Sequence, residues 1–317
     1  VKGTLTYLSE NRQTKDLNKR MPVYEYDNAT QEPFAVGQAG ADTIEESLYQ
    51  FKRVYPTVSI SYENTFGDHD IKGLLLTETI DEETINFNAS RRDLLSSDLP
   101  FLNLGSDLGI QNSGNAFEFG RSSVVGRVNY GYKNKYFLES SFRYDASSNF
   151  AEESRWGFFP SISAAWRLSE EDFLKDVDFV NSLKVRMSLS KTGRDDVGFY
   201  RYLEAFAIQE STSIYDSGPY LFTNSGLSPS ISTTGLANPN VTWRELTTYN
   251  FGVDAQLFDG LLGVELDIFY RDQKGIFATP LVKLPSTFGA TLPQTNQNST
   301  SNRGFDLVLT HKDKIGE

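Results

Sequence analysis

The sequence of 317 residues contains no cysteine. This absence excludes a disulfide framework, a thiolate metal site and a cysteine nucleophile. Histidine is almost as scarce, because only His69 and His311 are present, far apart in the chain. So small a set of ligands argues against a zinc enzyme. His69 stands beside Asp68 and Asp70, a composition more typical of a polar hairpin turn than of a metal site.

The signatures of nucleotide-binding and hydrolytic enzymes are also missing. The chain has no P-loop, no GxSxG element and no dinucleotide fingerprint. Glu265 and Asp267 resemble the carboxylate pair of a glycosidase, but no pocket motif accompanies them. Asp195 and Asp196 lack EF-hand spacing and are interpreted as part of a solvated loop. The formal net charge of -12 argues against nucleic acid as a partner. The sequence therefore predicts no enzyme and no cofactor.

Long apolar runs are absent as well. No segment of about 18 apolar residues is present, so no transmembrane helix is predicted. The N-terminal segment does not have the pattern of a signal peptide. The chain opens on Val1 in a strand-like segment, and residues 312–317 have the composition of a turn. We therefore expect a piece of a longer chain.

The sequence is rich in strict alternation of apolar and polar residues. Residues 249–257 and 262–271 show it most clearly, on either side of a tight turn at 258–261. Because neighbouring residues of a β-strand point to opposite faces, such segments predict strands with one apolar and one charged side. Aromatic residues make up 13% of the chain, which suits an all-β core or a girdle at a membrane interface.

About ten strands are expected, and their connections alternate between short and long. The expected strands are 1–8, 51–63, 71–80, 122–132, 136–145, 157–168, 182–191, 242–257, 262–273 and 303–311. Up-and-down barrels of the outer membrane have short turns at one end and long loops at the other. Strands of ten or more residues are long enough to cross a bilayer at a tilt. The pattern predicts an all-β, antiparallel, up-and-down transmembrane β-barrel, with apolar faces toward lipid and charged faces around water.

A soluble secreted β-sandwich, such as an adhesin, would show the same local alternation with its apolar faces turned inward. The two folds differ in whether a second layer covers Val185, Val253 and Leu266. One short connection is expected to be helical, because Ser169 has the position of an N-cap before the acidic residues 170–172.

Candidate substrate contacts fall into two groups. The long connection 192–241 carries Tyr215, Tyr220 and Phe222 among small polar residues, a mixture suited to stacking on sugars or apolar peptide side chains. The same mixture equally suits a loop that packs on itself or on a partner. The second group would line the water-filled interior on the polar strand faces: Arg127, Arg143, Arg186, Glu265, Asp267 and Arg271.

Several stretches together carry a family resemblance. They are residues 126–136, 142–150, 155–161, 165–171, 183–188, 191–193, 238–243, 249–254, 284–285 and 304–306. These stretches resemble the barrel of SusC/RagA-type TonB-dependent outer-membrane transporters. The resemblance is close over 120–317 and looser over 1–120.

The resemblance implies a 22-stranded barrel plugged by an N-terminal domain, in the outer membrane of a Gram-negative bacterium. Residues 1–317 would form part of one barrel domain surrounded by outer-membrane lipid, without the plug, the TonB box or the signal peptide. The expected function is TonB-energised import of glycan oligosaccharides or peptides with a SusD-like lid lipoprotein. The alternative is a TonB-dependent receptor for a siderophore or vitamin that has no lid protein.

Overall fold

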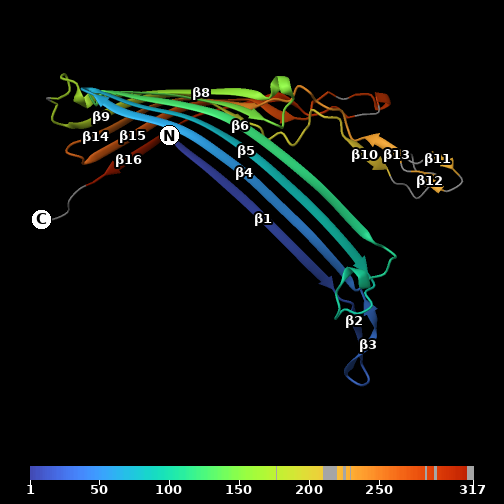
Figure 1. Cartoon of the computed structure of the whole chain (residues 1–317). Helices are drawn as coiled ribbons and strands as arrows, with labels where there is room; N and C mark the ends of the chain where they lie inside the picture. Colours follow the sequence, from blue (N-terminus) through green and yellow to red (C-terminus); the bar gives the residue numbers. More distant parts are fainter. Residues whose placement is uncertain are drawn as a thin grey trace. The chain divides into compact units, whose positions relative to one another are not determined.

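The computed structural model describes residues 1–175, 177–209, 220–223, 226–228, 230–282, 284–288 and 291–312. Its main element is a ten-stranded sheet in the order β1-β4-β5-β6-β7-β8-β9-β14-β15-β16 (Figure 1). The strands are β1 (Lys2–Asn18), β4 (Thr43–Phe66), β5 (His69–Arg92), β6 (Gln111–Tyr132), β7 (Tyr136–Ser147), β8 (Trp156–Arg167), β9 (Val180–Arg194), β14 (Arg244–Leu257), β15 (Leu262–Ala278) and β16 (Thr295–His311). All pairs from β6 to β16 are antiparallel, so the expected up-and-down order is confirmed.

The remaining elements lie in the connections. Three two-stranded antiparallel sheets pair β2 (Met21–Asp27) with β3 (Glu32–Ala39), β10 (Phe206–Gln209) with β13 (Ser230–Thr233), and β11 (Tyr220–Thr223) with β12 (Gly226–Ser228). The 3-10 helices are η1 (Leu102–Leu104), η2 (Glu152–Ser154), η3 (Leu168–Glu170) and η4 (Ser286–Phe288). None of the helices among the described residues is long and apolar enough to cross a membrane.

The chain divides into two compact units. The first contains residues 1–4, 57–79 and 121–317, and the second contains 5–56 and 80–120. In the second unit, cross-strand ion pairs join Lys52 to Glu83 at 3.2 Å and Arg53 to Glu82 at 2.7 Å. β4 and β5 have 24 residues each, more than twice the number that a bilayer crossing needs.

In the first unit, the apolar faces of neighbouring strands are in register. Val253 on β14 lies opposite Val185 on β9 and Leu266 on β15. All three remain partly exposed, and on the same face Met187 is 59% and Ile268 50% exposed. Among the residues that the structure describes, no second sheet covers this apolar face. The sandwich alternative is therefore wrong, and the uncovered apolar face is that of a barrel wall.

The short connections are tight turns. Between β6 and β7, Lys133 and Asn134 both have positive φ angles of 50° and 55°. They are the two central residues of a turn closed by a hydrogen bond from the Lys135 amide to the Tyr132 carbonyl at 2.9 Å, and two positive φ angles in such a turn match the twist of the strands. Among the described residues of the connection after β8, the helical part is the 3-10 helix η3, and the expected N-cap is wrong because Ser169 lies inside this helix. The physical reason is a competing contact, because Glu171 binds side chains of β7 and β8.

Candidate functional site

Arg186 is the centre of a charged network on the polar face of the sheet. Its two terminal nitrogens donate to the two carboxylate oxygens of Asp267, both at 2.7 Å. Nε and Nη2 also donate to Asp254, at 3.2 and 3.1 Å. These residues lie on β9, β15 and β14, so one guanidinium links three strands. Such bidentate, charge-assisted bonds are among the stronger polar contacts in proteins.

Gly252 makes this network possible. It is opposite Arg186 on one side and Asp267 on the other. A Cβ atom at position 252 would lie 2.6 Å from Cζ of Arg186, which is closer than real contacts allow. The glycine therefore lets the arginine cross over β14 to reach β15. A glycine inside a strand often marks such a close approach.

Arg143 forms a second network of the same kind. Its Nη2 donates to Glu78 on β5 at 2.8 Å, to Asp145 on its own strand at 3.1 Å and to Oγ of Ser123 on β6 at 3.2 Å. Arg143, like Arg186, therefore neutralises two carboxylates in the wall. Sequence reasoning selected both arginines, but it missed the acids Glu78, Asp145 and Asp254.

The other predicted residues of the wall are not part of these networks. Arg127 and Glu265 are exposed on β6 and β15. The guanidinium of Arg271 lies over the ring of Phe269, 4.5 Å from its centroid. Tyr215 lies outside the described residues. Only the backbones of Tyr220 and Phe222 are described, in β11, and nothing places their side chains at a site.

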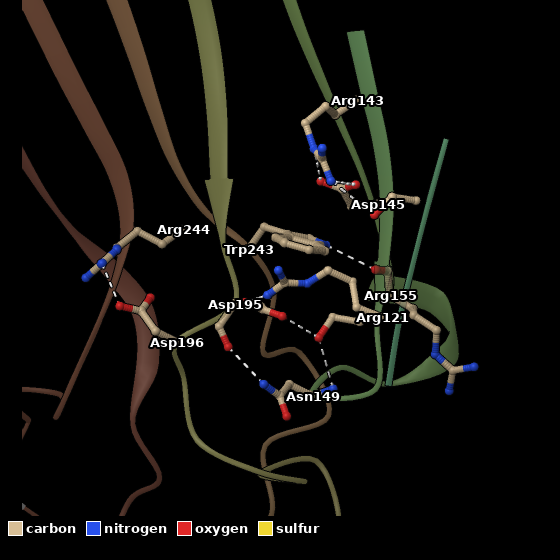
Figure 2. Close-up of polar contacts among 11 residues, drawn as sticks. Arg121, Arg143, Asp145, Asn149, Arg155, Asp195, Asp196, Trp243 and Arg244 are labelled. Carbon is tan, nitrogen blue, oxygen red and sulfur yellow. Dashed lines mark hydrogen bonds and ion pairs between the residues drawn. The ribbon is translucent and has the colours of Figure 1, made fainter. Parts of the chain in front are cut away.

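The long connection from β9 to β14 is anchored by a buried apolar cluster, which we call the loop-root cluster. It consists of Phe150, Phe159, Val197, Val241 and Trp243. The ring of Trp243 lies 5.1 Å from that of Phe150 and 5.2 Å from that of Phe159. Its Nε1 donates to the backbone oxygen of Arg155 at 3.1 Å (Figure 2). The cluster thus joins the β7–β8 connection to both ends of the β9–β14 connection.

Asp195 holds the polar side of the same loop root. Its side chain pairs with Arg121 and accepts from Oγ of Ser147 at 2.7 Å. Nδ2 of Asn149 donates to the backbone oxygen of Asp195 at 3.0 Å (Figure 2). Asp195 is only 8% exposed, so its interpretation as part of a solvated loop is wrong. The reason is tertiary, because the partners of Asp195 come from β6, from the end of β7 and from the β7–β8 connection.

Asp196 is turned the other way and is half-exposed. It accepts from Nη2 of Arg244, the first residue of β14, at 2.7 Å. The two neighbouring aspartates therefore bind residues on different elements. No group of three or more histidine, aspartate or glutamate side chains with metal-binding geometry occurs in the described part of the chain.

Aromatic side chains form two bands on the apolar face. At the short-turn end, Tyr136 stacks on Trp166 with centroids 6.0 Å apart. At the long-loop end, Tyr144 stacks on Trp156 at 4.6 Å. The interval from Tyr136 to Tyr144 corresponds to about 27 Å along a strand. With a typical strand tilt this approaches the apolar band of about 25 Å in outer-membrane barrels.

His69 belongs to the turn-side band. It is the first residue of β5, and its Nδ1 lies 2.8 Å from the hydroxyl of Tyr130. Its ring lies 4.8 Å from that of Tyr132. The sequence-based interpretation of His69 as part of a polar hairpin turn is confirmed in its position, and its aromatic neighbours are an addition from the structure.

Glu171 fastens the turn after β8 to the wall. Its carboxylate accepts from the Tyr136 hydroxyl at 2.5 Å, from Nε1 of Trp166 at 3.1 Å and from Nζ of Lys135 at 3.2 Å. These hydrogen bonds favour the charged form, and they lower the pKa of Glu171 to about 2.

We expect Glu171→Gln to remove part of the acid sensitivity of the barrel. The pKa of this carboxyl is lower in the folded protein than its usual value of 4.5, so protonation favours unfolding. The stabilisation is complete above about pH 5 and is lost as the pH falls toward 2. Thermal unfolding of the two proteins in detergent should therefore differ at pH 7 and converge near pH 2. An equal difference at both pH values would contradict this assignment.

Comparisons with known proteins agree with this architecture. Residues 4–312 match the family model described as TonB dependent receptor-like, beta-barrel. The chain is 30% identical to TonB-dependent receptor P39 of Formosa agariphila over 80% of its length, and 30% identical to TonB-dependent receptor SusC of Bacteroides thetaiotaomicron over 60%. It covers 23% and 18% of those proteins, so it spans about a fifth of their length.

Solved structures share the fold. The RagAB peptide importer in its open-open state superposes with a TM-score of 0.79 at 22% identity, over 97% of this chain and 31% of that chain. The RagAB peptide transporter gives a TM-score of 0.77 over 98% of this chain and 31% of that chain, also at 22% identity. The chain belongs to the TonB-dependent receptor-like β-barrel family.

Proposed function

We propose that the protein containing this chain is an active importer in the outer membrane of a Gram-negative bacterium. It takes up oligosaccharides or peptides, is energised by TonB and works with a SusD-like lipoprotein as its lid. Residues 1–317 form part of its single barrel domain. The observation that carries the proposal is a single sheet with an uncovered apolar face and a charged opposite face, because only a wall between lipid and water suits both.

The charges of the polar face support a transport role rather than catalysis. Arg186 and Arg143 each neutralise two carboxylates within the wall. Asp267, one of the two carboxylates of the glycosidase-like pair, is therefore engaged in an ion pair that links strands. A wall whose strongest charges are balanced suits a neutral or zwitterionic cargo better than a highly charged one. The likeness to the RagAB peptide transporter supports peptides within this cargo class.

The test uses the full-length protein with and without its lid lipoprotein. Isothermal titration against panels of oligosaccharides and peptides should reveal binding of one of these classes. Cells expressing the pair should accumulate that cargo only when TonB is present. If no member of either panel binds, and a metal chelate alone is taken up, the proposal is wrong.

A further inference from the structure

A groove crosses the apolar face of the barrel wall. Its volume is about 630 Å³, and it extends across strands from β7 to β16. Its lining includes Leu138, Ile162, Met187, Phe251 and Ile268. Ala164 lies in register between Leu138 and Met187, so a methyl group stands where its neighbours have long side chains. The groove is therefore a depression in a surface that is otherwise formed by large apolar residues.

One cationic side chain, that of Arg303, lines the long-loop end of this groove. Arg303 on β16 lies opposite Tyr270, whose ring is 6.1 Å from that of Tyr249 on β14. Arg303 is exposed, and among the residues that the structure describes it forms no ion pair. The carboxylate of Asp272, two positions beyond Tyr270, is held instead by Lys274 at 3.3 Å.

Arg303 lies at the same height in the barrel wall as the aromatic band at the long-loop end. Tyr270 lies eight residues after Leu262, the first residue of β15, just as Tyr144 lies eight residues after Tyr136 on β7. Below Arg303 on the same face of β16 come Phe305 and Leu307, which are exposed. The guanidinium therefore stands where the hydrocarbon layer meets the headgroups on the long-loop side.

We propose that this groove binds an anionic, phosphorylated lipid of the leaflet on the long-loop side. The acyl chain lies against Ile162, Met187 and Ile268, and the phosphate accepts hydrogen bonds from Arg303. Guanidinium groups bind phosphate through two parallel bonds, and an uncompensated charge at the edge of hydrocarbon is costly. The inference rests on the proposed location of the protein in the outer membrane.

The experiment measures lipid bound to the full-length protein extracted from outer membranes in mild detergent. Copurified phosphorylated lipid is identified by mass spectrometry, and rebinding is measured from micelles that contain lipid A or phosphatidylcholine. Arg303→Ala removes the cation and Ala164→Phe fills the groove, so each should reduce retained lipid A by about tenfold. Arg127→Ala is the matched control, because it removes an exposed arginine from the opposite face and should leave the amount of retained lipid A unchanged.

Several outcomes would overturn the inference. These are full retention of lipid A by both Arg303→Ala and Ala164→Phe, an equal loss in Arg127→Ala, or equal binding of phosphatidylcholine. Displacement of the lipid by millimolar inorganic phosphate would show a phosphate site only. If Ala164→Phe changes the oligomeric state and leaves the lipid bound, the groove is an interface between two copies.

Failure of this inference is distinguishable from failure of the proposed function. Protein that is recovered from outer membranes and imports its cargo, but carries no phosphorylated lipid, contradicts the lipid site alone. Protein that is absent from the outer membrane contradicts the proposed function as well. The two groove variants act independently, so a variant that does not assemble leaves the other to decide.

Discussion

Replacing Trp243 by alanine should lower the free energy of unfolding of the barrel by about 3–5 kcal/mol. Trp243 is 5% exposed and fills the space between Phe150 and Phe159. Truncation removes the buried ring and leaves a cavity, because the cluster is held by strands on two sides. It also leaves the backbone oxygen of Arg155 without its indole donor. The change can be measured as a shift of the denaturation midpoint of the full-length protein in detergent micelles.

The control for Trp243→Ala is Trp243→Phe. Phenylalanine keeps an aromatic ring in the cluster but cannot donate the hydrogen bond to Arg155, so a loss of about 1 kcal/mol is expected from the bond, plus a smaller packing loss. A second control, Trp156→Ala, removes a tryptophan that is half-exposed on the apolar face. If Trp156→Ala destabilises the protein as much as Trp243→Ala, burial in the loop-root cluster is not what makes Trp243 important.

The importance of Trp243 shows where sequence reasoning stops. Residues 238–243 contributed to the family resemblance, but nothing in their spacing identifies Phe150 and Phe159 as neighbours. Those contacts join segments more than 80 residues apart, and they depend on the register of β7, β8, β9 and β14. The sequence signal that could have indicated these contacts was a pair of glycines. Gly157 and Gly193 leave room for the ring of Phe159, which a side chain at either position would displace.

The strand pattern was predictable where one face meets lipid and the other meets water. All ten strands of the main sheet were expected, and the ends of β7, β8 and β15 near the short turns agree within about two residues. The expected strands that correspond to β4, β5 and β6 are each more than ten residues too short. The missing extensions are held partly by ion pairs such as Arg53–Glu82, and their apolar alternation is short, as in Ile85, Phe87 and Ala89.

On the polar face, the side of the sheet on which a residue lies was predictable, but its binding partner was not. Alternation placed Arg186 and Asp267 on one side of the sheet, which the structure confirms. It could not show that they bind each other, because β9 and β14 are separated by a connection of about 50 residues whose register the sequence does not specify. The interior role of Arg127, Glu265 and Arg271 stays a prediction.

Replacing Arg186 by methionine should destabilise the barrel by about 2 kcal/mol. The substitution leaves the carboxylates of Asp254 and Asp267 close together without their shared cation. Loss of one partner of a fully buried ion pair costs about 3–5 kcal/mol, and solvent screening reduces that figure here because the side chains are about a third exposed. Lys184, whose Nζ is 3.9 Å from Asp254, compensates only one of the two acids.

A double-mutant cycle separates this electrostatic effect from lost packing. If the uncompensated charge is the cause, Arg186→Met combined with Asp267→Asn should be more stable than the sum of the two single changes predicts. Gly252→Ala tests the geometry independently, because its Cβ would displace the guanidinium without removing any charge. We expect a loss of about 1–2 kcal/mol from it. Additive single changes and a neutral Gly252→Ala would together show that the network does not bind the three strands to one another.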